Sequence, residues 1–193
     1  RTRGFSCVAG LDEVGRGPLS GPAVAACVVL PPHCNSAPYL DSKKLSHNRR
    51  CLLAETLSEI GALTGVGIVS IATIDRINIL QASLLAMKRA VENLASTLPA
   101  PDFLLIDGKF KIPMDTPQFT LIKGESKSAS IAAASILAKV TRDALMVDLS
   151  GRFPQYNLAQ NKGYPTQEHR RAIEKYGPAP CHRKTFKGVR EFV

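Results

Sequence analysis

The segment PDFLLIDG, residues 101–108, most constrains the fold, because it is a short, uninterrupted apolar run that ends in an acid and a glycine. A strand with one face in water alternates apolar and polar residues, whereas a continuous apolar run is typical of a strand buried inside a sheet. We therefore predict a central strand here, with the rest of the chain packed around it.

The remaining chain supplies elements of both kinds. Four further segments have the pattern of strands: 5–12, 22–30, 63–71 and 118–124. A connection rich in Gly, Pro and Ser joins the first two and predicts an antiparallel hairpin. Helical patterns follow Ser46, run from Thr73 to about Leu98, run through many alanines from Ser126 to about Phe153, and run from Pro165 to near Gly177. Antiparallel strands followed by alternating strands and helices predict an α/β fold with a mixed five-stranded sheet flanked by helices.

Length and composition favour one globular protein. The chain has 193 residues, of which 45% are hydrophobic and 21% charged, as in ordinary folded domains. We expect residues 1–153 to form the main domain and the polar, basic residues 154–193 to form a small helical extension packed on it. No apolar run approaches the roughly 18 residues of a membrane span, so we expect no contact with a membrane.

Charge and cysteine content narrow the environment. Lys and Arg number 25 against 16 Asp and Glu, which gives a net charge of +9. Such an excess suits a polyanionic partner, because neutralised phosphates release their counterions, although an ordinary basic surface has the same balance. The five cysteines are odd in number and form no CxxC pair, which predicts free thiols in a reducing cytoplasm.

Acids end three of the predicted strands, each beside a glycine. Asp12 and Glu13 end the first strand, Asp107 ends the central one, and Glu125 follows the last. Ligands of open α/β sheets bind at the carboxyl ends of strands, so these acids can converge there. Carboxylates that converge raise each other's pKa, and a hard cation removes that cost; oxygen ligands favour Mg²⁺, with Mn²⁺ as a substitute. The alternative is that each acid is a surface residue or caps a turn.

The tandem acids lead directly into Gly15-Arg16-Gly17. Neighbouring residues of a strand point to opposite faces, so acids that share one site require the backbone to turn at the strand's end. The glycines leave backbone N–H and C=O groups uncovered, and such a loop can bind a sugar or a phosphate.

Six ordered segments closely resemble the type 2 ribonucleases H, the ribonuclease HII family: GLDEVGRGPLSGP, LDSKKLS, FLLIDG, SIAAASILAKVTRD, NKGYPTQEH and GPAPCHRKTF. The resemblance covers nearly the whole chain. It implies a ribonuclease H-like fold, with a catalytic domain in residues 1–153 and a substrate-binding extension in 154–193. It also implies an endonuclease that cleaves the RNA strand of RNA–DNA hybrids, and single ribonucleotides in duplex DNA, on the 5′ side of the ribonucleotide. The products would carry 3′-hydroxyl and 5′-phosphate ends, and we expect the enzyme to act as a monomer.

The resemblance also implies which acids hold the two divalent ions, Mg²⁺ or Mn²⁺, that such a hydrolase uses. Asp12, Glu13 and Asp107 match three of the family's four metal-binding acids. The fourth position is commonly Asp, and here it is Glu125, one methylene longer. Asp143 is a competing candidate, although Lys139 four residues earlier could hold it in a helix ion pair.

The resemblance further implies how the substrate is read. Gly15, Arg16 and Gly17 match the loop that reads the 2′-hydroxyl, the group that distinguishes RNA from DNA. Tyr164 matches the tyrosine that stacks on the sugar of the following deoxynucleotide. A tyrosine packed at a helix entry is the alternative for Tyr164.

Basic side chains in the matching segments are candidates for phosphate contacts, which position a duplex without reading its sequence. The candidates are Lys43, Arg142 and Arg183, followed by Lys44, Lys127, His182 and Lys184. A solvated surface cation is the alternative for each. Two other functions stay open at this point: a metal-dependent nuclease that acts on DNA junctions, and a non-catalytic module that binds hybrids.

Overall fold

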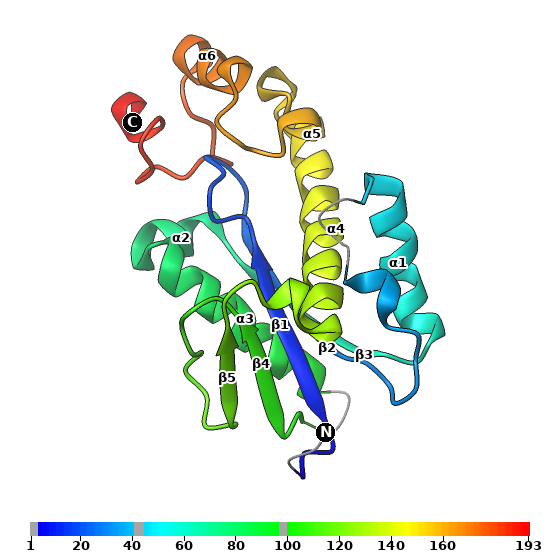
Figure 1. The fold of residues 1–193 in the computed structure, drawn as a ribbon. Helices are drawn as coiled ribbons and strands as arrows, with labels where there is room; N and C mark the ends of the chain where they lie inside the picture. Colours follow the sequence, from blue (N-terminus) through cyan, green and yellow to red (C-terminus); the bar gives the residue numbers. More distant parts are fainter. Residues whose placement is uncertain (1–3, 41–44, 97–99) are drawn as a thin grey trace.

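The computed structural model describes residues 4–40, 45–96 and 100–193 and is built on one five-stranded sheet with helices on both faces (Figure 1). The strands are β1 (Val8–Val14), β2 (Ala23–Val29), β3 (Leu63–Val69), β4 (Phe103–Asp107) and β5 (Gln118–Leu121). Their order is β3-β2-β1-β4-β5, in which β1–β2 and β2–β3 are antiparallel and β1–β4 and β4–β5 are parallel. This confirms the mixed five-stranded sheet, the hairpin and the position of β4 inside the sheet.

The helices form a layer on each face of the sheet. They are α1 (His47–Glu59), α2 (Ile71–Ile77), α3 (Ile79–Ala95), α4 (Ala129–Arg152), α5 (Leu158–Asn161) and α6 (Gln167–Tyr176), with 3-10 turns η1 (Ala37–Tyr39), η3 (Gly124–Ser126), η4 (Pro154–Tyr156) and η5 (Arg190–Phe192). Helix α3 packs on one face, and α4 with α1 on the other, so alternate residues of β2 enter two separate hydrophobic clusters. Within the described residues, no helix is long and apolar enough to cross a bilayer.

Two of the predicted helix boundaries are wrong, and capping explains both. The helix expected from Thr73 to Leu98 is two helices, because Asn78 has a φ of +67° and its side chain accepts a hydrogen bond from the Gln81 amide (3.1 Å). The alanine-rich helix begins at Ala129 rather than near Ser126, because Ser128 is its N-cap. Residues 124–126 instead form the short turn η3, which leaves Glu125 outside the helix.

Close contact between β1 and α4 depends on one glycine. A Cβ atom on Gly10 would overlap the backbone of Ser130 and Ile131 in α4. Four alanines of α4 have small side chains that let the helix lie flat against the sheet and are fully buried: Ala132, Ala133, Ala134 and Ala138. The sequence therefore brings the backbone of α4 directly over the strand that carries Asp12.

The segment that follows α4 forms a third cluster at one end of the sheet (Figure 1). Tyr156, Leu158 and Ile173 of this segment pack with Leu19 of the β1–β2 connection and Met146 of α4. Thus the C-terminal residues lie on the connection that contains Gly15-Arg16-Gly17.

Substitution Gly10→Ala should lower the free energy of unfolding by about 3 kcal/mol, because the added methyl group cannot enter without moving α4 away from β1. The measurement is urea unfolding followed by circular dichroism. The matched control is Gly151→Ala in α4, where the new Cβ meets nothing within 4 Å; it should be neutral or stabilising by up to about 1 kcal/mol. Equal stability of the two variants would contradict the close approach.

Candidate active site

Strand β1 carries Asp12 and Glu13 as consecutive residues of a regular ladder. Asp12 pairs with Ala26 and Glu13 with Ala25, and the strand continues to Val14. The prediction that the strand ends at residue 12 was therefore wrong: the backbone turns after Val14, at Gly15, and not between the acids. The two carboxylates consequently leave β1 on opposite faces, close to the end of the sheet.

Asp12 is buried against α4. Its side chain accepts a hydrogen bond from the Glu13 amide (2.7 Å) and interacts with the Ser135 hydroxyl of α4, and only 7% of the residue is exposed. Burial, together with the charges of Glu13 and Asp107, raises the pKa of Asp12 from 3.8 to about 8. In this surrounding the carboxyl group retains its proton at neutral pH unless a cation offsets its charge.

Glu13 lies beside Arg16, its nearest recorded cation. The Glu13 Oε1 atom is 3.3 Å from Arg16 Nη1, and the glutamate side chain is 11% exposed. Burial raises the pKa of Glu13 despite the opposing effect of Arg16. Glu13 and Asp107 both border a small hollow on the α3 side of the sheet, so Glu13 faces the same end of the sheet as the other acids.

Asp107 and Glu125 are brought together by the end of β4 and the turn η3. The Gly124 amide donates to Asp107 Oδ1 (2.6 Å), and the carboxyl groups of Asp107 and Glu125 hydrogen-bond to each other. Burial and the neighbouring Glu125 raise the pKa of Asp107. Because Leu11 pairs with Ile106 in the parallel ladder, the next residues, Asp12 and Asp107, lie side by side.

These four acids suit a divalent cation. Three of them have raised pKa values caused by burial and by one another, and a cation would offset both effects. In the described parts of the chain, no three His, Cys, Asp or Glu side chains form a ready-made ligand cluster. That openness is usual for Mg²⁺, which keeps several waters and uses one or two carboxylates plus phosphate oxygens of the substrate.

Asp143 belongs to a different arrangement. Its Oδ1 atom is 2.7 Å from Lys139 Nζ and its Oδ2 atom is 3.8 Å from His47 Nδ1. The structure therefore shows Asp143 in the helix ion pair that its spacing from Lys139 allowed. The Glu125 carboxyl group, in contrast, is hydrogen-bonded to that of Asp107, which makes Glu125 the better candidate for the fourth acid.

A groove of about 360 Å³ brings Glu13, one of the four acids, together with basic and aromatic side chains. Its lining consists of Glu13 and Val14 from β1, Arg50 from α1, Ser135, Ile136 and Lys139 from α4, and Tyr164. Arg50 and Lys139 supply positive charge to this groove, and Tyr164 offers a half-exposed ring. Sequence reasoning did not identify Arg50 or Ser135 as site residues, because a helical arginine or serine has no motif and only packing brings it to the acids.

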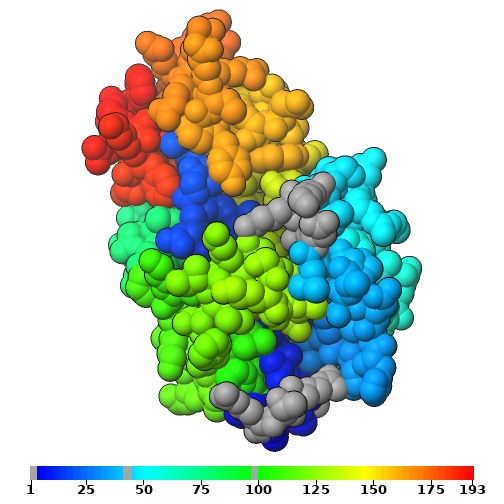
Figure 2. Space-filling model, in the orientation of Figure 1, coloured from blue at the N-terminus to red at the C-terminus, as the bar shows by residue number. Residues whose placement is uncertain are grey.

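The connection of residues 15–22 forms the border between the sheet and the C-terminal segment. Gly15 has a φ of +98°, and a Cβ there would lie 2.9 Å from the Pro22 carbonyl oxygen, so only glycine suits this position. A Cβ on Gly17 would lie 3.6 Å from the ring of Tyr164. The loop therefore approaches the tyrosine at Gly17, and Figure 2 shows the blue N-terminal part of the chain at the surface beside the orange C-terminal segment.

The predicted phosphate contacts of Arg142 and Arg183 are wrong. Both residues are completely buried, and their guanidinium groups donate to backbone carbonyls instead: Arg142 to Ser20, Pro22 and Lys162, and Arg183 to several residues between Gly15 and Pro22. His182 is buried as well, with its Nε2 atom 3.0 Å from His169 Nε2. Lys43 and Lys44 lie outside the described residues.

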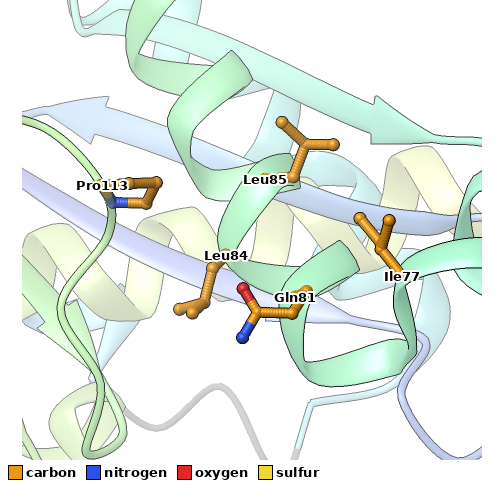
Figure 3. Close-up of a pocket in the computed structure, with 5 residues that line it drawn as sticks. All are labelled: Ile77, Gln81, Leu84, Leu85 and Pro113. Carbon is orange, nitrogen blue, oxygen red and sulfur yellow. The ribbon is translucent and has the colours of Figure 1, made fainter.

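A separate hollow of about 340 Å³ lies on α3, lined by Ile77, Gln81, Leu84, Leu85 and Pro113 (Figure 3). None of these side chains ionises, so the hollow offers no group for acid–base chemistry or for metal binding. The acid end of the sheet, where four carboxylates gather, stays the candidate site.

Without divalent cations, the free energy of unfolding should fall as the pH rises from about 4 to about 8. In that window the folded protein keeps a proton on Asp12, whose pKa is about 8, while the unfolded chain has lost it, so raising the pH favours unfolding. The slope is at most about 1.4 kcal/mol per pH unit for one proton. Asp12→Asn should reduce this slope in urea titrations with EDTA, and the raised pKa values of Glu13 and Asp107 account for the slope that remains.

The control for this pH dependence is Asp148→Asn, because Asp148 is an exposed carboxylate paired with Arg152 at 3.1 Å. It should leave the slope unchanged. Parallel pH profiles for the parent protein and Asp12→Asn would contradict the assignment of the raised pKa to Asp12.

The family model for ribonuclease HII matches residues 9–189. Ribonuclease HII of Desulfotalea psychrophila is 59% identical over 190 residues, covering 98% of this chain and 84% of the relative. Ribonuclease HII of Geotalea uraniireducens is 52% identical over 193 residues, covering 100% and 88%. The crystal structure of ribonuclease H2 from Pyrococcus horikoshii OT3 has a TM-score of 0.77 and 25% identity, covering 97% of each chain.

Proposed function

The chain belongs to the ribonuclease HII family of endonucleases, which act on the RNA strand of RNA–DNA hybrids and share a ribonuclease H-like fold, and from this premise we propose its finer activity. The protein cuts duplex DNA at single embedded ribonucleotides, and it also cuts the RNA strand of long RNA–DNA hybrids. It hydrolyses the phosphodiester bond on the 5′ side of the ribonucleotide and leaves 3′-hydroxyl and 5′-phosphate ends.

One observation carries this proposal: Glu13, one of the four acids at the end of the sheet, lines the same groove as Tyr164, and Gly17 of the Gly15-Arg16-Gly17 loop lies beside the Tyr164 ring. The acids supply the place where a phosphodiester is cut. The loop and the tyrosine supply groups that can read the sugar next to that phosphate, because backbone N–H groups bind a 2′-hydroxyl without regard to the base. Cleavage and sugar recognition therefore fall within one groove of one chain, for which a monomer is sufficient.

Asp12, Glu13, Asp107 and Glu125 would hold Mg²⁺ or Mn²⁺ at this site. Two such ions, when bound, supply positive charge to the attacking and leaving oxygens of a phosphodiester. The chain's own contributions are positional: Ser135 orients Asp12, the Gly124 amide orients Asp107, and Arg16 favours the ionised form of Glu13. Arg50 and Lys139 line the path of the phosphates. We place the activity in the cytoplasm, where ribonucleotide-containing bacterial DNA lies.

Asp107→Asn should abolish cleavage of a DNA duplex that contains one ribonucleotide, because it removes a charge that holds the cations while keeping the side chain's size. The assay compares this duplex with a long RNA–DNA hybrid and an all-DNA duplex, in Mg²⁺ and in Mn²⁺, and resolves the products by gel. A single cut on the 5′ side of the ribonucleotide is expected for the parent protein.

The matched control is Asp102→Asn, at the opposite end of β4, where the carboxylate accepts hydrogen bonds from the backbone amides of Ser6 (2.7 Å) and Cys7 (3.0 Å). This variant should cleave as the parent does. Unchanged turnover by Asp107→Asn would contradict the site. A parent protein that cut only four-way DNA junctions, or that bound hybrids without cutting them, would contradict the proposed activity.

Glu125→Asp should keep cleavage within about tenfold of the parent and change the ratio of the rates in Mn²⁺ and Mg²⁺, because the carboxylate remains but reaches less far from η3. Glu125→Gln should lose about 100-fold or more, since the negative charge that the cations require is gone. Initial rates on the single-ribonucleotide duplex in each metal test both variants. If Glu125→Gln were as active as Glu125→Asp, Glu125 would not be the fourth ligand.

A further inference from the structure

The guanidinium group of Arg183 makes all its recorded hydrogen bonds to one short stretch of backbone. Its Nη2 atom donates to the carbonyl oxygen of Gly15 (2.7 Å), its Nη1 atom to that of Pro18 (2.9 Å) and, more weakly, to that of Arg16 (3.4 Å). Its Nε atom donates to the Gly21 carbonyl (3.0 Å). No salt bridge of Arg183 occurs in the part of the chain that the structure describes, so the backbone carbonyls are the partners of this buried cation.

These hydrogen bonds determine where the amide groups of the loop point. A trans peptide group is planar and its C=O and N–H point in opposite directions. When the carbonyls of Gly15 and Arg16 point inward to Arg183, the N–H groups of Arg16 and Gly17 point away from it. In the described structure neither of these N–H groups has a hydrogen-bond partner.

Two other amides of the connection are used within the protein. The Leu19 amide donates to the Gly163 carbonyl (2.8 Å) and the Gly21 amide to the Cys181 carbonyl (2.9 Å). Gly15 and Ser20 are buried, whereas Arg16 and Gly17 are exposed, so in the described connection the peptide groups next to Arg16 combine an inward carbonyl with an amide that is open to a ligand. That combination requires a donor beneath the loop, because carbonyl oxygens turned into the interior without a partner would be costly.

Arg183 is in turn held in place from helix α2. The carboxylate of Asp75 accepts hydrogen bonds from the backbone amides of Lys184 (3.1 Å) and Thr185 (3.1 Å) and from the Thr185 hydroxyl (2.7 Å). The ring of Phe186 lies 5.0 Å from the Arg183 guanidinium carbon. The residues directly after Arg183 are therefore attached to a helix that touches neither the acids nor the groove.

We propose that Arg183, seated by Asp75, is a positioning residue for ribonucleotide recognition: it orients the peptide groups on either side of Arg16 so that their N–H groups face the 2′-hydroxyl of the substrate. This inference rests on the proposed function, in which that loop reads the 2′-hydroxyl. It assigns no substrate contact to Arg183 or Asp75 themselves. Lysine cannot replace the arginine, because one ammonium group does not span carbonyls that a planar fork of donors reaches together.

The test is the preference of the protein for a ribonucleotide. It is measured as the dissociation constant for an all-DNA duplex divided by the dissociation constant for the same duplex with one ribonucleotide. Fluorescence anisotropy gives binding to an all-DNA duplex and to the same duplex with one ribonucleotide, in Mg²⁺, with Asp107→Asn in every protein to prevent cleavage. Arg183→Lys should reduce the ratio about tenfold, the equivalent of one lost hydrogen bond, while affinity for the all-DNA duplex changes little. A reduced fraction of folded protein affects both constants equally and cancels in the ratio.

Two further variants complete the experiment. Asp75→Ala removes the hydrogen bonds that hold the residues after Arg183, without changing the buried core, and should reduce the ratio about threefold. This variant tests the proposal if Arg183→Lys does not fold. Tyr156→Phe removes a hydrogen bond from the Tyr156 hydroxyl to the Gly177 carbonyl (2.7 Å) in the same C-terminal segment and should leave the ratio unchanged.

The outcomes separate this inference from the proposed function. An unchanged ratio in Asp75→Ala and in folded Arg183→Lys would overturn the role of Arg183. A ratio that fell equally in Tyr156→Phe would also overturn it, since any loosening of the C-terminal segment would then suffice. A parent protein with no preference for the ribonucleotide would instead contradict the proposed function of the loop, and the role of Arg183 with it.

Discussion

The parallel pairing of β1 with β4 is the constraint on which the rest of the site depends. It places Asp12 next to Asp107 at the buried end of the sheet, and the absence of a side chain at Gly10 lets α4 cover that end and bring Ser135 to Asp12. Burial that stabilises the core therefore also destabilises the charged carboxylates. Cations that bind between these acids would offset this cost and stabilise the folded protein.

Positive charge occurs in two places near the acids, one in the groove and one beneath the β1–β2 connection. Arg50 and Lys139 line the groove itself, where a phosphate can reach them. Arg142 and Arg183 lie beneath the β1–β2 connection and are saturated by backbone carbonyls. A buried guanidinium without such acceptors would be unstable, so the connection and the two arginines stabilise each other. The two cations in the groove suit binding of a duplex, whereas the two buried arginines stabilise the conformation of the β1–β2 connection.

Several properties of the fold could be predicted from sequence because they are local. The apolar run of β4, the Ser46 cap of α1 and the alanines of α4 led to correct elements. The wrong boundaries occurred where short polar residues compete for caps: Asn78 divides α2 from α3, and Ser128 rather than Ser126 begins α4. The predicted phosphate contacts of Arg142 and Arg183 were wrong for a related reason. A basic residue in a matching motif has the same sequence pattern whether its side chain faces a phosphate or supports a loop.

The sequence by itself determined the α/β class and the family, and it predicted which acids gather at the sheet's end, because strand patterns, glycine positions and carboxylates are properties of the chain at each residue. Only the tertiary structure decided which charged side chains contact one another and which are buried. It showed Glu125 bonded to Asp107, Asp143 engaged by Lys139, and Arg142 and Arg183 in the interior. The physical reason is that pKa, burial and hydrogen-bond partners depend on atoms distant in sequence, such as the carbonyl of Gly15 and the side chain of Arg183, 168 residues apart.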